Sequence, residues 1–521
     1  MPSGQYCILH APQKNKDLPS FNKAVQKFLA ADKSDFRYVH FPDGYSFGQE
    51  NKPFPAIADF TDSVFYSELN LAGATLPHGL TLRAKEIKTI RLSNASVIGD
   101  ITIEVQGSVE TINFESAIID AAVSLNIADR VNNILFHGAQ FKRRIMLKAG
   151  NVTQLSFNAP STVINDILVE VKEKLSFFEG TLCHFQSDVT VKANTLEKLS
   201  LAKSRIDGML TVQHGSGLNK VQDKSIIGIN LSGATLGRGV NLSGCNIKTY
   251  SAGFQNANFT DATELILDRA VIDGDLTIIA SPIPPKSVML AGCIVTGETK
   301  ICSELRQPLI EIIAKVNRPE FFGNVLLSNV SLRECRLVGN PIDKITLSNI
   351  RWTEVTGGRA VLYDETELSS NSTLSRNIQG AYQVLKEKYR QLGDHSLSGD
   401  FHFGEMEMKR REVGFFKRNL GWEAWYYYLS GYGTRPLRAM LCLLYLLVLF
   451  TCIFTLWGDP KVENNVQESF LFTMQAATFQ PLSADQAQWT GETRLMASLV
   501  RVVVPLQAGL LALAIRMRLK R

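Results

Sequence analysis

A repeat with a period of about 21 residues is the feature that most restricts what this 521-residue chain can fold into. Between Leu69 and Trp352, a small residue recurs two positions before a large apolar one. The first six small residues are 21, 22, 22, 41 and 24 positions apart. The pairs are Ala74 and Leu76, Ala95 and Val97, Ala117 and Ile119, Ala139 and Phe141, Gly180 and Leu182, Ser204 and Ile206, Ala234 and Leu236, Cys245 and Ile247, Ala257 and Phe259, Ala270 and Ile272, Cys293 and Val295, and Cys335 and Leu337. This regularity predicts stacked copies of one structural unit.

Each unit also contains a β-rich segment in which apolar and polar residues alternate. Examples are GDITIEV at 99–105, NDILVEV at 165–171 and SDVTVKA at 187–193. A period of two favours strands over helices. We therefore predict a four-sided coil of parallel strands, with the large residue on the axis and the small one where two faces meet. Roughly thirteen such coils, each rising about 4.8 Å, would bury their apolar residues only against one another.

Three segments resemble the pentapeptide-repeat family, whose units read Ala, then Asp or Asn, then Leu and two free positions. They are GINLSGATLGRGVNLSGCNI (228–247), AGFQNANFTDA (252–262) and LLSNVSLRECRLV (326–338). The resemblance implies a mainly β fold, with a right-handed quadrilateral parallel β-helix over residues 60–356.

Charge and motif content exclude several functions for this rod. Residues 60–360 contain 30 Lys and Arg against 29 Asp and Glu, so neither a nucleic-acid partner nor mimicry of DNA is expected. Cysteines in the small position are expected to pack as compact apolar groups. The chain shows no evident nucleophile with a base, phosphate loop or metal-ligand cluster. We therefore assign no catalytic, cofactor-binding or metal-binding residue and do not expect an enzyme.

The segments that flank the repeat have other patterns. Residues 1–59 are expected to cap the first coil, because an open solenoid end exposes unpaired strand edges. Residues 377–433 are predicted to contain a helical hairpin, with helices at about 380–392 and 398–412, followed by an aromatic segment. Trp422, Trp425, Tyr426 and Tyr432 in that segment lie beside lysines and arginines, which is typical of residues at a membrane interface.

The last part of the chain, 434–521, is predicted to be a two-transmembrane domain. Residues 439–457 contain no charged side chain over nineteen positions, and 495–515 are also long enough to span a bilayer. Lysines and arginines gather before the first span and after the second. The positive-inside rule then places both termini in the cytoplasm.

A short helix is predicted between the two spans, within 467–482. Its place in the order resembles two-transmembrane pore domains, and the whole chain resembles bacterial membrane proteins that join pentapeptide repeats to a channel-like module. Candidate pore or membrane-functional residues are Thr478, Phe479, Gln480, Arg501 and Gln507. The triplet Gly431, Tyr432 and Gly433 spells a potassium filter, but it precedes the first span and is expected to be a turn.

Two functions fit this organisation. The first is a multi-pass protein of the bacterial inner membrane, whose cytoplasmic solenoid senses or binds a protein partner and is coupled to a channel-like module. A homo-oligomer is expected in this case, because two helices do not enclose a pore. The second is a membrane-anchored scaffold that does not conduct and uses the solenoid as a protein-interaction surface. Both require a lipid bilayer as a partner.

Overall fold

The computed structural model describes residues 7–12, 16–47, 53–158, 160–213, 225–243, 245–253, 258–259, 263–280, 283–303, 309–356, 358–368, 372–413, 415–457, 465–480 and 491–519. The chain divides into two compact units. The solenoid unit comprises 1–336 and 344–351, and the helical unit comprises 337–343 and 352–521.

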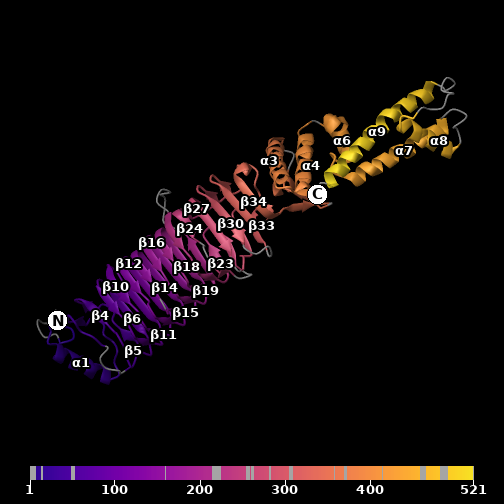
Figure 1. The fold of residues 1–521 in the computed structure, drawn as a ribbon. Coiled ribbons are helices and arrows are strands. Elements are labelled where there is room, and N and C mark those ends of the chain that lie inside the picture. Colours follow the sequence, from indigo (N-terminus) through magenta and orange to yellow (C-terminus); the bar gives the residue numbers. More distant parts are fainter. Residues whose placement is uncertain are drawn as a thin grey trace. The chain divides into compact units, whose positions relative to one another are not determined.

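The solenoid unit is a stack of about 12 turns of parallel strands, which confirms the predicted fold class (Figure 1). Within the described residues its strands form one sheet of 23, one of nine and one of two. The sheet of nine contains β5 (Thr75–Leu76), β8 (Ser96–Val97), β11 (Ile118–Ile119), β13 (Gln140–Phe141), β15 (Thr162–Val163), β17 (His184–Phe185), β19 (Arg205–Ile206), β22 (Thr235–Leu236) and β25 (Asn258–Phe259).

The sheet of 23 covers the longer sides of the coils. Its strands are β2 (Ala58–Asp59), β4 (Glu68–Asn70), β6 (Leu80–Ala84), β7 (Thr89–Arg91), β9 (Ile101–Val105), β10 (Val109–Asn113), β12 (Val123–Leu135), β14 (Ile145–Ser156), β16 (Ile167–Glu179), β18 (Val189–Ser200), β20 (Met209–Gln213), β21 (Ser225–Asn230), β23 (Gly239–Asn241), β24 (Asn246–Gly253), β26 (Glu264–Ile266), β27 (Val271–Ala280), β28 (Ser287–Met289), β29 (Ile294–Val295), β30 (Thr299–Ser303), β31 (Ile310–Ala314), β32 (Glu320–Phe321), β33 (Val325–Cys335) and β34 (Ile345–Arg351).

One coil shows how four sides arise from about 22 residues. The short strand β11 forms one side, and β12 forms two, because its register against β14 shifts between Ile127 and Arg130. The fourth side is a tight turn at 114–117. There Ser116 is left-handed, with φ 55°, and its N–H donates to the carbonyl of His137 in the next coil at 2.8 Å. Every side is therefore hydrogen-bonded to the neighbouring coil.

The small and large positions lie inside the coils as predicted, with one correction. The pair Gly180 and Leu182 is wrong, because Leu182 is 60% exposed and sits in a left-handed turn. The buried pair in this coil is Cys183 and Phe185, and Phe185 is in register with Val163 of the coil before. Ala257 lies outside the described residues. The interval of 22 residues therefore continues through the gap of 41, where Ser161 and Val163 are the buried pair of the intervening coil.

Burial also determines the protonation state of the inward-facing cysteines. Burial raises the pKa of the Cys245 and Cys293 thiols to about 12. These groups are therefore neutral at physiological pH and pack as small apolar side chains.

Phenylalanines form a column along part of the solenoid axis. Phe136 lies 5.2 Å from Phe114 and 4.6 Å from Phe157 between ring centroids, and all three are buried. Stacked rings of this kind add about 0.5–1.5 kcal/mol per pair to the burial of their area. The column fixes the register of successive coils.

Helix α1 (Leu18–Ala30) lies at the N-terminal end of the solenoid (Figure 1). Asp17 caps the helix by accepting from the N–H of Ser20 at 3.0 Å. Phe21 and Val25 are buried, and the Phe21 ring contacts the rings of Phe41 and Tyr45. Strand pairing already begins here, since β1 (His40–Phe41) pairs with β3 (Val64–Phe65).

Charged side chains on the outside of the solenoid pair across neighbouring coils. Glu170 accepts from Lys148 and Lys192, each at 3.2 Å. Burial alone would raise the pKa of Glu170, but the two lysines outweigh it and lower the pKa. Asp207 behaves in the same way between Arg205 and His184. These ladders place opposite charges side by side on a rod whose basic and acidic residues are nearly equal in number.

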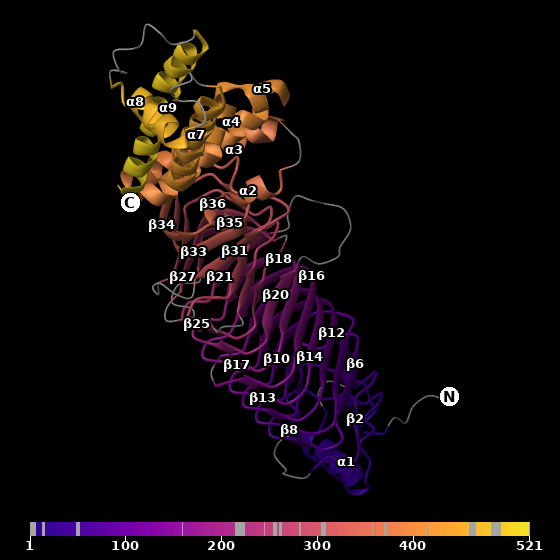
Figure 2. The same cartoon turned by 90° about the vertical axis from the view of Figure 1, so that its right-hand side faces the viewer.

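The helical unit begins with a small antiparallel pair, β35 (Thr353–Val355) and β36 (Arg359–Val361). Helices follow almost without interruption (Figures 1 and 2). They are α2 (Tyr363–Thr366), α3 (Ser372–Gln391), α4 (His395–Glu412), α5 (Phe415–Leu420), α6 (Trp422–Ser430), α7 (Pro436–Trp457), α8 (Val466–Ala477) and α9 (Gly491–Leu519), and a short 3-10 helix, η1 (Ile342–Lys344), precedes the strand pair. The predicted hairpin is confirmed as α3 and α4, which pack along each other.

Candidate functional site

Helices α7 and α9 are the two candidate membrane-spanning helices. Both are long and apolar enough to cross a membrane, with mean hydropathies of 2.6 and 1.9 over their most apolar windows, and only 22% of each window is buried within the chain. Their contact is made by large apolar side chains that include Phe450, Phe454, Val500 and Val504. Most of the remaining surface of α7 is exposed and apolar. An apolar surface of this extent needs lipid or another apolar partner.

The short helix α8 packs against both α7 and α9. Asn465 caps it by accepting from the N–H groups of Gln467 and Glu468. Phe472 meets Phe454 of α7 edge to face at 4.9 Å, and Ala476 belongs to the same apolar cluster. Ser469 and Thr473 are buried beside them, and the Thr473 hydroxyl donates to the Ser469 carbonyl. The prediction of a short helix between the spans is confirmed.

Three of the candidate pore residues lie together at the end of α8. Thr478, Phe479 and Gln480 follow the last turn of the helix and are all exposed. Phe479 is left-handed, with φ 56°, so the chain turns sharply here. Residues 481–490, which follow Gln480, lie outside the described residues.

The other two candidates, Arg501 and Gln507, lie on α9 and differ in their hydrogen bonding. The Nε of Arg501 is buried and has no hydrogen-bond partner within the described part of the chain. Gln507 is buried, and its side-chain amide donates to the carbonyls of Leu429 and Ala439, each at 2.9 Å. Gln507 therefore joins α9 to α6 and α7 inside one chain. Within the described residues, no hydrogen bond or ion pair joins Arg501 or Gln507 to the end of α8.

The Gly-Tyr-Gly triplet is a turn between α6 and α7, as expected. Gly431, Tyr432 and Gly433 are all left-handed, with φ of 58°, 57° and 72°. A side chain at Gly433 would lie 2.7 Å from the Tyr426 hydroxyl and 2.9 Å from Leu513. The turn thus needs glycine both for its backbone and for the close approach of α9.

Tyr432 differs from the expected interfacial role, since it is fully buried. Its ring contacts Phe403, Tyr426 and Tyr427. Its hydroxyl donates to the Glu407 carboxylate at 3.4 Å. Burial, together with the negative charge of Glu407, raises the pKa of the Tyr432 hydroxyl, so it stays protonated and remains a donor.

Glu407 is the centre of a buried charge network on α4. Arg410 donates to its two carboxylate oxygens at 3.2 and 3.0 Å, and Arg411 donates at 3.3 Å. The Arg410 guanidinium also lies 4.4 Å from the Tyr427 ring centroid. Because Glu407 and Arg410 are both buried, the network ties α4 to the turn from which α7 starts. Sequence reasoning missed it, because KRR at 409–411 resembles a solvated basic end of a helix.

A second buried network holds the base of the helical unit. Arg359 on β36 pairs with Glu365, which also accepts from the Tyr382 hydroxyl of α3. The Tyr382 hydroxyl in addition accepts from the N–H of Leu362 at 3.0 Å. Burial and Glu365 raise the pKa of Tyr382 well above its usual range. Nothing in the spacing of these residues indicates the network, since its members come from separate elements.

The remaining interfacial candidates differ in their exposure. Trp422 is 89% exposed, Trp425 is more than half exposed, and Tyr426 is half-buried. Phe416 and Leu420 of α5 add two exposed apolar side chains that the sequence analysis did not single out. The aromatic segment thus presents an apolar surface immediately before α7.

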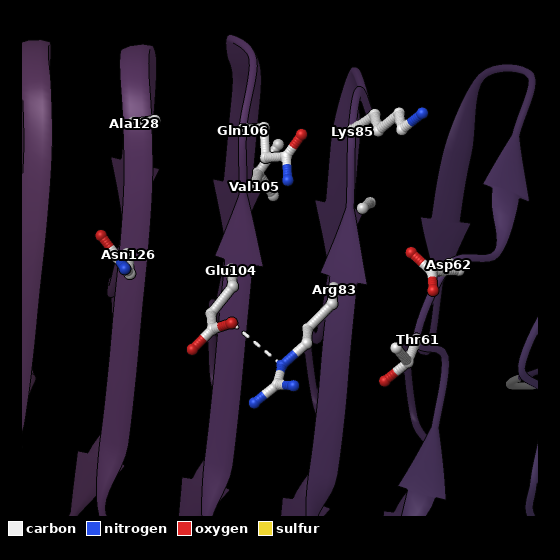
Figure 3. A pocket seen from close by; sticks show the side chains of 10 residues that line it. Thr61, Asp62, Arg83, Lys85, Glu104, Val105, Gln106, Asn126 and Ala128 are labelled. Atoms are coloured by element: carbon white, nitrogen blue, oxygen red, sulfur yellow. Dashed lines mark ion pairs between the residues drawn. The ribbon is translucent and has the colours of Figure 1, made fainter.

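The solenoid has a shallow pocket of about 390 Å³ near its N-terminal end (Figure 3). Its side chains project from neighbouring parallel strands. Arg83 forms an ion pair with Glu104 of the neighbouring coil at 2.9 Å, and Asp62 and Lys85 lie beside them. The lining of the pocket therefore contains two acidic and two basic groups.

Comparison of the chain with protein-family models, with curated proteins and with solved structures gave no match. The function must therefore be argued from the geometry described above.

Proposed function

We propose that this chain is an integral membrane protein in which α7 and α9 span the bilayer and anchor the solenoid. The observation that carries the proposal is the apolar surface of α7, whose exposed residues include Leu444, Tyr445, Val448 and Leu456. Burial of such surface in lipid is favourable by about 25 cal/mol for each Å² of area. The exposed aromatic residues of α5 and α6 support a segment at the headgroup level.

The expected topology places both chain ends, and with them the solenoid, on the cytoplasmic side of the bacterial inner membrane. It is supported by the sequence bias, because arginines flank the start of α7 and the end of α9. The proximity of Gly433 to Leu513 also supports it, since the beginning of α7 and the end of α9 then lie on one side.

The proposal is tested by extraction and protease protection. Membranes that contain the chain are washed with alkaline carbonate, and the cytoplasmic face is then exposed to protease in inverted vesicles. The chain is expected to stay with the membrane and its solenoid to be digested. Release by carbonate would refute the anchor, while protection of the solenoid would refute the orientation.

We further propose that α7, α8 and α9 form one subunit of an oligomeric, channel-like module. The packing of α8 on both long helices supports this, because it leaves Thr478 and Gln480 exposed at the end of a short helix. Such an end lines the conduction path in channels that have a re-entrant helix. Two spanning helices do not enclose a path alone, so several copies are required.

Ion flux into liposomes tests the channel. Gln480→Ala is compared with Gln475→Ala, which removes the same group from an exposed position one turn earlier on α8. The expected result is flux with the unaltered chain that changes in rate or selectivity in the first variant only. Absence of flux from well-inserted protein would contradict conduction.

The second candidate function is a scaffold that does not conduct. It is favoured by the exposed face of α7, which offers almost no polar side chain to line a water-filled path. In this case the solenoid, with its balanced charge ladders and the pocket at Arg83, binds a protein partner. Recovery of a stoichiometric partner that is lost in Arg83→Glu, without any membrane conductance, would favour the scaffold over the channel.

A further inference from the structure

We propose that a pocket at the beginning of α7 binds the phosphate group of an anionic glycerophospholipid. The pocket has a volume of about 450 Å³ and lies entirely within the helical unit. It is formed by residues of β36, α4 and the first turns of α7. The inference rests on the proposed insertion of α7 into a bilayer.

Three arginines give the pocket its charge. They are Arg359, Arg435 and Arg438, and the acidic residue in the lining is Asp400, which accepts from the N–H of Ala360 at 3.1 Å. Arg435 and Arg438 form no ion pair with any residue that the structure describes. The lining thus carries an excess of positive charge that an anion would balance.

Arg359 provides a donor that is already desolvated. Its side chain is only 7% exposed, and one terminal nitrogen, Nη2, is engaged by Glu365. The other terminal nitrogen, Nη1, is buried and has no hydrogen-bond partner in the described parts of the chain. An unpaired buried donor of a charged group costs free energy that a ligand oxygen would recover.

Phe403 brings two of the guanidinium groups together. The Cζ atoms of Arg359 and Arg435 lie 4.9 and 5.0 Å from the centroid of its ring. Arg438 is held in a similar way, 4.4 Å from the ring centroid of Tyr427. Aromatic contacts orient the cations without neutralising them, so the guanidinium groups remain available to a phosphate.

The first turn of α7 adds main-chain donors to the same place. Its first N–H groups have no partner within the helix, and the helix begins with Pro436. Positive partial charge at a helix start attracts phosphate groups. The arginines and the helix start therefore favour the same chemical group.

The apolar side of the pocket identifies a lipid as the source of that phosphate. Leu437 and Leu441 line the pocket and are also exposed on the outer surface of α7. A ligand that fills the site meets cations at one end and a lipid-facing leucine surface at the other. Inorganic phosphate uses only the first of these, whereas a glycerophospholipid uses both.

The test measures binding of labelled phosphatidylglycerol to the full chain in detergent. Arg435→Gln with Arg438→Gln is the test variant, since neither side chain is buried. Arg418→Gln with Arg516→Gln is the matched control, because it removes two exposed arginines outside the pocket. Each pocket arginine is expected to contribute about fivefold to the affinity, so the test variant should bind roughly 25-fold more weakly. The control should change the affinity less than twofold.

Two outcomes would overturn the inference. An equal loss of affinity in the control variant would show that net charge alone attracts the lipid. Displacement of the lipid by inorganic phosphate at millimolar concentration would show that the site serves a soluble anion.

Vesicles of phosphatidylcholine with and without one quarter phosphatidylglycerol provide a second readout, and only the mixed vesicles should protect the chain from thermal unfolding. Release of the chain by carbonate would refute the anchor separately, because the binding assay is carried out in detergent.

Discussion

Replacement of Glu407 by glutamine should strongly destabilise the helical unit. The Glu407 carboxylate and the Arg410 guanidinium are both buried and joined by bonds of 3.2 and 3.0 Å. Removal of the charge from one partner leaves the other charge buried without compensation, which costs about 3–5 kcal/mol. For a unit of this size, each kcal/mol shifts the melting temperature by about 2–4 °C, so the loss should be roughly 6–20 °C.

The chain offers a matched control for this change. Glu387 and Arg390 on α3 form a pair with the same spacing of three residues, at 2.8 Å, but both side chains are exposed. Glu387→Gln should therefore leave the melting temperature of the helical unit unchanged. The assay is scanning calorimetry of the full chain in lipid nanodiscs, in which the melting of the helical unit is followed.

A double-mutant cycle separates the pair from its surroundings. Glu407→Leu combined with Arg410→Met replaces both buried charges by apolar side chains, which is often nearly neutral for a buried pair. The double variant should therefore be more stable than Glu407→Leu alone, with a coupling energy of about 2 kcal/mol or more. Additive effects, or a single loss below about 1 kcal/mol, would show that water reaches the network and would refute the reasoning.

Three further predictions concern the solenoid and the turn before α7. Phe136→Ala should destabilise the solenoid by about 3–5 kcal/mol in thermal unfolding, because it leaves a cavity in the phenylalanine column, whereas Ile118→Ala at an exposed position should have little effect. The pKa of Glu170 is lowered in the folded chain, so the stabilisation that its carboxylate contributes is present above the unfolded pKa of about 4.5 and is lost as the pH falls through the folded pKa. Circular dichroism during acid titration should show this loss of solenoid stability, and Glu170→Gln should reduce the loss. Gly433→Ala should lower the melting temperature of the helical unit, because its Cβ would contact Tyr426 and Leu513, whereas Gly380→Ala on α3, which has open space, should raise it slightly.

Local patterns were sufficient to predict the solenoid, because each coil repeats the same inward positions at a nearly constant interval. The one error, at Gly180 and Leu182, has a local cause. Both this pair and the true pair, Cys183 and Phe185, have a small residue two positions before a large one, so spacing alone does not distinguish them. The register with the neighbouring coils determines which pair is buried, and this register is known only once the strands are paired in the structure.

Residues of the helical unit were less predictable, because their roles depend on partners far away in the sequence. Tyr432 stands in a segment rich in exposed aromatic residues, yet it is buried against Glu407, 25 positions earlier. The amide of Gln507 binds main-chain carbonyls 78 and 68 positions earlier, and no side-chain pattern indicates such a contact. Helices were thus predictable from periodicity, while the contacts between them were not.

The regular interval inside the solenoid has a consequence for how its length is set. Coils such as those starting at Ala117 and Ala139 have equivalent residues in register, so each offers its successor the same upper surface that it receives from below. Removal of 22 residues between equivalent positions would therefore rejoin matching surfaces and shorten the stack by about 4.8 Å. Gain or loss of whole coils can therefore adjust the length of the solenoid in fixed steps without any change to its interior.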